Sequence, residues 1–142
     1  MPTPITFRKN IILWVDDRPT NNMASAEKMR VESNDSIEIL QLTSTKMAEE
    51  WMKLFSWILV WSGVQFKVIS DMVRDEEKGP NYYAGVDLLE IFYNKYGYTT
   101  PIMIYCSAVE KGVQNAKDRK VRKQSLYKIT NKEAEVVKYA RF

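Results

Sequence analysis

Short apolar runs alternate with longer segments of helical spacing along this chain. The first run, Ile11 to Val15, contains no polar residue, and the segment after it carries Met23, Ala26 and Met29 three residues apart. Apolar runs of this kind are typical of parallel strands that helices cover on both faces. The pattern predicts an α/β fold with a doubly wound, five-stranded parallel sheet. A helix is expected after each strand, and the strands are expected at residues 9–15, 37–42, 66–70, 102–106 and 126–130.

Glycine and proline residues set several of the expected boundaries. Gly63 ends the second helix, Gly97 ends the third, and Pro101 opens the fourth strand. The helices are expected at residues 21–32, 46–61, 84–96, 109–120 and from 132 onward. The charged stretch between the third strand and the third helix is expected to be an exposed loop, and its charged residues include Arg74, Asp75, Glu76 and Glu77.

The size and composition indicate one globular domain, residues 1–142. The chain has 142 residues, 45% of them apolar, and a formal net charge of +3. This length is sufficient to bury a core without disulfides, and the charge is too small to argue for nucleic acid. The apolar stretch from Trp51 to Ile69 is interrupted by Lys53 and Gly63, so its uncharged part is shorter than the roughly 20 residues of a bilayer span. No membrane segment is expected.

Histidine and cysteine usage narrows the chemistry. The chain contains no histidine, which excludes a Ser-His-Asp triad, a histidine-bound zinc and a phosphohistidine on this chain. Cys106 is the only cysteine, so no intramolecular disulfide can form and a reducing, cytoplasmic location is expected. Any phosphoryl chemistry here must use carboxylates.

Acidic residues follow two of the predicted strands at the point where each ends. Asp16 and Asp17 follow the first strand, and Asp71 follows the third. Two buried strands that deliver acids to one crevice form a pocket of like charge, which is unstable unless a divalent cation or a proton occupies it. The sequence therefore predicts a functional site at this edge of the sheet.

Four short motifs lie at successive strand ends and helix starts. They are Ile-Leu-Trp-Val-Asp16-Asp17, Val-Ile-Ser-Asp71-Met, Gly85-Val-Asp-Leu-Leu and Pro101-Ile-Met-Ile-Tyr-Cys-Ser107-Ala. In this order they resemble the receiver domain of bacterial two-component response regulators, and the likeness spans nearly the whole chain. The resemblance implies a flavodoxin-like (βα)5 receiver fold.

The resemblance also implies roles for the acids. Asp71 would accept a phosphoryl group from the phosphohistidine of a partner histidine kinase or phosphotransfer protein, and a downstream effector would respond. Asp17 and Asp71 would bind Mg²⁺, Asp17 directly, and Asp16 would support the ion partly through water. The backbone carbonyl of Val73 would complete the protein ligands. Magnesium prefers such hard oxygen ligands and offsets charge as a phosphoryl group moves.

Two positions depart from the receiver pattern. A hydroxyl is expected after the fourth strand, where counting from Pro101 gives Cys106 and matching the Ser-Ala dipeptide gives Ser107. Ser107 is favoured because a thiol is a poor hydrogen-bond donor. The lysine expected after the fifth strand falls on Asn131 or on Lys132, and Lys132 could instead start the last helix and point into solvent. With Asn131 in that place, the cation that neutralises the phosphate is missing.

Two surfaces are candidates for partner contacts. The expected helix 46–61 is apolar around more than half its girth, so its second face is either packed within the chain or forms a homodimer or partner interface. Its aromatic residues are Trp51, Phe55, Trp57 and Trp61. A basic cluster after the fourth strand is expected to be a solvated helix face rather than a nucleic-acid site, and it comprises Lys117, Arg119, Lys120, Arg122 and Lys123.

The sequence favours a switch over a turnover enzyme, with two rival functions. A pseudo-receiver would keep the fold as a protein interaction module and would have lost phosphotransfer. A magnesium-dependent phosphohydrolase or nuclease of related topology is less well supported, because an Asp-x-Asp nucleophile motif or further acids at later strand ends are not evident.

Overall fold

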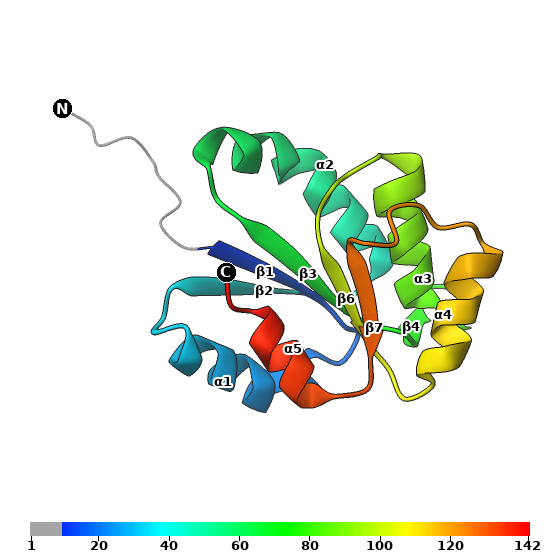
Figure 1. The fold of residues 1–142 in the computed structure, drawn as a ribbon, viewed down its shortest axis with the longest axis horizontal. Helices are drawn as coiled ribbons and strands as arrows, with labels where there is room; N and C mark the ends of the chain where they lie inside the picture. The colour runs from blue at the N-terminus through cyan, green and yellow to red at the C-terminus, as the bar shows by residue number, and fades with distance from the viewer. Residues whose placement is uncertain (1–9) are drawn as a thin grey trace.

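The sheet is built around β1, which spans Asn10–Val15. The computed structural model describes residues 10–142, apart from the side chains of residues 58–62, so residue 9 of the predicted first strand lies outside the described part. β1 lies between β2 (Ile37–Leu42) and β3 (Phe66–Asp71). With β6 (Ile102–Tyr105) and β7 (Tyr127–Thr130), the described residues form a five-stranded parallel sheet in the order β2-β1-β3-β6-β7 (Figure 1). The predicted doubly wound sheet is confirmed.

Helices cover both faces of this sheet (Figure 1). α1 (Met23–Glu32), which follows the 3-10 helix η1 (Pro19–Asn22), lies beside α5 (Glu133–Tyr139) on one face. α2 (Thr45–Ser62), α3 (Ala84–Leu89) and α4 (Val109–Asp118) cover the other face, and α3 continues into the π-helix η2 (Glu90–Lys95). Among the described residues, no helix combines the length and apolar character that crossing a bilayer requires.

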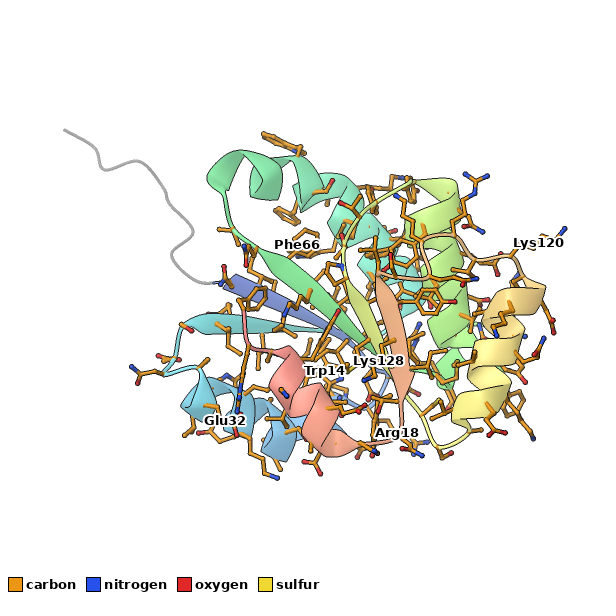
Figure 2. The ribbon with its side chains drawn as sticks, in the orientation of Figure 1. Trp14, Arg18, Glu32, Phe66, Lys120 and Lys128 are labelled. Atoms are coloured by element: carbon orange, nitrogen blue, oxygen red, sulfur yellow. The ribbon has the colours of Figure 1, made fainter. Side chains whose placement is uncertain are left out.

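The alternation of side chains along the central strands gives each face its own core. Leu13 and Val68 pack in the cluster beneath α2, α3 and α4. Ile12, Trp14 and Ile69 pack in the cluster beneath α1 and α5, where Figure 2 shows Trp14. Because both faces of β1 are buried from Ile11 to Val15, this part of the strand is a continuous apolar run in the sequence.

The ends of α2 follow from local chemistry. The Ser44 hydroxyl accepts the backbone N–H of Met47 at 3.1 Å and so caps the first turn. At the other end Gly63 has a φ of +73°, a left-handed conformation that glycine adopts without steric cost. The predicted glycine end of this helix is confirmed.

The charged segment between β3 and α3 folds as a short hairpin. β4 (Arg74–Glu76) and β5 (Gly79–Asn81) pair antiparallel at the carboxyl end of the sheet (Figure 1). Gly79, directly after the turn, has a φ of +108°, which side chains disfavour. The loop expected here therefore contains two short paired strands.

The prediction that this loop is exposed was wrong for Glu76, and Arg74 beside it is buried as well. Arg74 is only 1% exposed and Glu76 is half-buried, whereas Asp75 and Glu77 are exposed as predicted. Glu76 accepts a hydrogen bond from the Thr45 hydroxyl at 2.7 Å, and its carboxylate lies 3.5 Å from Nε of Arg74. The two side chains turn inward because each provides the other with a charged partner.

α2 presents apolar side chains to solvent as well as to the core. Trp51 packs against Phe66 of β3 with ring centroids 6.4 Å apart. Leu54 is 64% exposed and Trp57 is 61% exposed. The side chain of Trp61 lies outside the described part. The predicted second apolar face of this helix is therefore open to solvent at Leu54 and Trp57.

Gly85 allows α3 to approach the strand that carries Asp71. A Cβ atom at Gly85 would lie 2.8 Å from the backbone carbonyl oxygen of Asp71. At Gly112 of α4, a Cβ atom would instead meet the flexible end of the Met72 side chain, 2.6 Å from Cε. A methionine side chain can move aside more easily than the backbone of a buried strand.

We predict that Gly85→Ala lowers the free energy of unfolding by about 1–3 kcal/mol because it overpacks the backbone of β3. Gly112→Ala is the matched control, since both variants gain the same helix propensity, and it should change stability by less than about 1 kcal/mol. Urea unfolding followed by circular dichroism measures both values. Equal losses in the two variants would contradict the close approach at Gly85.

Candidate functional site

The carboxylates of Asp16, Asp17 and Asp71 lie together at the carboxyl edge of the sheet. Asp16 and Asp17 follow β1, and Asp71 is the last residue of the neighbouring β3. One carboxylate oxygen of each residue lies within 4.8 Å of the other two. The chain leaves β1 toward β2 and leaves β3 toward β6, so the acids lie at the topological switch point, where open α/β sheets bind ligands. The convergence that the strand ends predict is present in the structure.

Neutral donors orient two of these carboxylates. Asp16 accepts the backbone N–H of Arg18 on Oδ1 at 2.8 Å and the side-chain amide of Asn22 on Oδ2 at 2.9 Å. Asp17 accepts the backbone N–H of Asp75, in the hairpin, on Oδ2 at 3.0 Å. These hydrogen bonds fix the side chains without cancelling their charge, so repulsion within the cluster remains.

The carboxyl of Asp71 is half-buried, and this burial changes its protonation. Burial raises the pKa of its carboxyl to about 8, against the opposing effect of the Arg74 charge, and the charge of Asp16 raises the pKa again. The anionic form of Asp71 is thus disfavoured by lost solvation and by a neighbouring acid.

The donor set fits a magnesium ion. Mg²⁺ takes a few carboxylate oxygens and completes its octahedron with water or phosphate oxygens. A dication between the three carboxylates would offset the repulsion that disfavours the anionic form of Asp71. Val73, whose backbone carbonyl is the further predicted ligand, follows Asp71 by two residues and has a half-exposed side chain.

A buried arginine contacts Asp71 from within the chain. The Arg74 side chain has no exposed surface, and its Nη1 donates to Asp71 Oδ1 at 2.6 Å and to the Ser70 hydroxyl at 2.7 Å. Its Nη2 donates to the Thr45 hydroxyl at 2.6 Å and to the carbonyl of Ala84 at 3.1 Å. Charged hydrogen bonds of this number hold a guanidinium in one orientation.

The hydroxyl predicted after the fourth strand lies beside the site. Ser107 is exposed and follows Cys106, which is half-buried and whose backbone N–H donates to the carbonyl of Thr130 at 2.9 Å. Burial raises the pKa of the Cys106 thiol, so it stays neutral. Both residues line a pocket of about 390 Å³ together with Val73. Val73 follows β3 and Ser107 follows β6, and both line this pocket.

The lysine predicted after the fifth strand lies at the start of the last helix. Lys132 is exposed, immediately precedes α5, and donates its backbone N–H to the Thr130 hydroxyl at 3.1 Å. Asn131 is also exposed and lines a separate pocket with Ser107. Within the described chain, no hydrogen bond or ion pair joins the Lys132 side chain to Asp71. The structure therefore does not bring Lys132 to the acids in the way the sequence pattern suggests.

Comparisons with known proteins give the fold. A scan against models of protein families finds no match, and a search of curated proteins finds none. Among solved structures, the chain is similar to the signal receiver domain of NarL from Mycobacterium tuberculosis, with a TM-score of 0.57, 13% identity and 94% of each chain covered. It is also similar to the signal receiver domain of an HD domain-containing protein from Pseudomonas fluorescens, with a TM-score of 0.58, 15% identity, and 99% of this chain and 90% of that chain covered.

This chain has the receiver-domain fold. Its strand order and helix placement match those of the two receiver domains over nearly their whole lengths. The similarity gives the fold alone. The residues that lie at the switch point of this chain are Asp16, Asp17 and Asp71.

Arg74 is the residue of this receiver fold that the sequence did not reveal. It sits in a run of charged residues, and the run as a whole reads as a solvated loop. The available signal is the short spacing to Asp71, since an arginine three residues after a strand-end acid can fold back onto it. That spacing alone does not separate a buried guanidinium from an exposed one.

Part of the basic cluster is engaged within the receiver fold. Arg119 pairs with Asp87 and Glu90 of α3 and η2, and Lys123 donates to the carbonyl oxygens of Gly97 and Tyr98. Lys120 lies at the outer end of α4 and points away from the sheet (Figure 2). The intramolecular pairs leave fewer cations for a phosphate backbone, in line with the low expectation for nucleic acid.

We predict that Asp17→Asn raises the free energy of unfolding without magnesium by about 1 kcal/mol, because it removes one charge from the cluster. Saturating Mg²⁺ should stabilise the natural chain by about 1–2 kcal/mol and the variant by much less. Urea unfolding with and without MgCl₂ measures both effects, with Glu50→Gln on the exposed side of α2 as the control. Equal gains from Mg²⁺ in the natural chain and in Asp17→Asn would contradict a metal site at these acids.

Proposed function

We propose that this chain is a phosphoacceptor signalling domain that binds Mg²⁺ and is phosphorylated on Asp71 by a partner histidine kinase or phosphotransfer protein. The proposal is supported by one observation above all, the convergence of Asp16, Asp17 and Asp71 at the switch point of a receiver fold. A downstream effector responds to the phosphorylated state. The domain works in the cytoplasm as a switch and not as a turnover enzyme.

The proposed reaction uses the Asp71 carboxylate as the nucleophile. One of its oxygens bonds to the phosphorus of the donor, the bond from phosphorus to the donor nitrogen breaks, and the electron pair leaves with that nitrogen. The product on the chain is a mixed anhydride. Asp16 and Asp17 would hold a magnesium ion together with Asp71, and such an ion would offset negative charge during the transfer. The Ser107 hydroxyl, which lines a pocket with Val73, is proposed to donate to a phosphoryl oxygen.

A second candidate function is a phosphorylation-independent pseudo-receiver. The observation that favours it is the pairing of Asp71 with Arg74, which supplies a counter-charge without any metal or phosphate. The exposed position of Lys132 points the same way. In that case the fold serves as a protein interaction module.

We predict that acetyl phosphate or phosphoramidate with Mg²⁺ adds one labile phosphoryl group to the natural chain and none to Asp71→Asn. Intact-protein mass spectrometry over a time course measures the adduct, and hydroxylamine treatment should remove it because it is an acyl phosphate. Asp75→Asn is the matched control, since that carboxylate lies four residues on and is 65% exposed.

Each outcome of that experiment assigns one function. An unchanged mass together with no stabilisation by Mg²⁺ would favour the pseudo-receiver. An adduct that persists in Asp71→Asn would move the acceptor to another residue. Steady turnover of a phosphate ester that is lost in Asp17→Asn would support the phosphohydrolase instead.

We also propose that α2 contacts a second copy of the chain through Leu54 and Trp57, which are both more than half exposed. Burying a side chain of this size stabilises a complex by about 2 kcal/mol, so Trp57→Ser should weaken self-association about 10-fold or more. Sedimentation equilibrium over a range of concentrations measures it. Tyr82→Ser, at an aromatic residue that is 65% exposed near the hairpin, is the control. A monomer at every concentration would contradict the homodimer.

A further inference from the structure

Arg74 brings a fixed positive charge to the acceptor carboxylate. Its Nη1 lies 2.6 Å from Asp71 Oδ1, and its side chain has no exposed surface. Burying a guanidinium is unfavourable unless it is paired and hydrogen-bonded. Here Ser70, Thr45 and Ala84 supply further acceptors to Nη1 and Nη2. Among the described residues, Nε has no hydrogen-bond partner, and it lies 3.5 Å from the carboxylate of Glu76. The charge is therefore part of the folded structure and does not depend on a flexible side chain finding the site.

The end of the fifth strand offers no comparable cation. Thr130, the last residue of β7, is buried, and its hydroxyl donates to the carboxylate of Glu135 in α5. Lys132 lies two residues further on, at the exposed start of α5. Of the two positions where the receiver pattern puts a lysine, Asn131 carries no charge and Lys132 is exposed.

We propose that Arg74 supplies the counter-charge to Asp71 during phosphoryl transfer, in place of the lysine that the receiver pattern puts after the fifth strand. This inference rests on the proposed function. It assigns a role in phosphoryl transfer to a residue of the hairpin between β3 and α3. The resemblance assigns no such role to the hairpin.

The hydrogen bond of Arg74 also distinguishes the two oxygens of Asp71. Because Nη1 holds Oδ1, Oδ2 is the oxygen that attacks. With acetyl phosphate as donor, a bond forms from Oδ2 to phosphorus, the bond from phosphorus to the acetate oxygen breaks, and acetate leaves with the electron pair. Oδ1 becomes the carbonyl oxygen of the mixed anhydride and stays within reach of Nη1. The guanidinium thereby orients the carboxyl plane through the whole step.

The experiment compares phosphorylation rates with acetyl phosphate and saturating Mg²⁺ by intact-protein mass spectrometry. Arg74→Gln keeps a hydrogen-bond donor but loses the charge, and we expect the rate constant at saturating donor to fall about 100-fold, with the half-saturating donor concentration changed less than about threefold. Arg74→Lys restores the charge without the planar fork and should recover about tenfold of that loss. Lys132→Ala should lose less than Arg74→Gln.

Two controls separate a role in the reaction from a role in folding. Met29→Ala removes a buried side chain from the core beneath α1 and α5, away from Arg74 and Asp71, so it should lower stability without lowering the rate as Arg74→Gln does. Lys128→Ala, at an exposed lysine paired with Glu135, controls for the loss of a surface charge. If Arg74→Gln does not fold, the phosphorylation rates of Arg74→Lys and Lys132→Ala still show which of the two cations matters more for the reaction.

The outcomes fall into distinct classes. A natural chain that accepts no phosphate would overturn the proposed function and this inference with it. Normal phosphorylation of Arg74→Gln, or a larger loss in Lys132→Ala than in the Arg74 variants, would overturn the inference alone. A loss in Met29→Ala equal to that in Arg74→Gln would also overturn it, since the loss of rate would then follow from the loss of stability alone.

Discussion

Repulsion between carboxylates at the junction of β1 and β3 is the constraint around which this molecule is arranged. Parallel strands deliver Asp16, Asp17 and Asp71 to one edge, and their oxygens meet within 4.8 Å. Water is partly excluded there, so the like charges are poorly screened. The guanidinium of Arg74 offsets part of this negative charge from within the fold. The magnesium ion that we propose would offset charge from the solvent side. The negative charge of the three acids would then be offset both from within the fold and from the solvent side.

The hairpin supplies the groups that contact the acids from within the fold. It carries Arg74 inward, and the backbone N–H of Asp75 holds Asp17 from the next position along the chain. Through Thr45 and Glu76 the same network reaches the first residue of α2. A segment that looks like a solvated insertion thus ties β1, β3, α2 and the start of α3 to one another at the carboxyl edge of the sheet.

The sequence predicts the features that depend on residues close together in the chain or on the ends of neighbouring strands. Apolar runs without polar alternation gave the strands of the sheet, Gly63 gave the end of α2, and the rule that acids at neighbouring strand ends converge gave the cluster. The burial of Arg74 is different, because it depends on Ser70, Thr45 and Ala84 being placed around it by the finished fold. The position of Lys132 depends on how α5 starts after β7, and a difference of one residue in that turn decides where its ammonium lies.

The residue that pairs with Asp71 decides which elements of the fold respond to a change at that carboxylate. A lysine after the fifth strand would link the acceptor to β7 and α5, whereas Arg74 links it to the hairpin and α2. When a carboxylate becomes a mixed anhydride, Oδ1 changes from a charged to a neutral oxygen, and an ion pair at 2.6 Å loses much of its strength. Arg74 then keeps Glu76 as its remaining anionic partner, with Nε 3.5 Å from that carboxylate. The proposed chemistry at Asp71 therefore acts first on the hairpin, where Thr45 and Glu76 share the guanidinium with the acceptor.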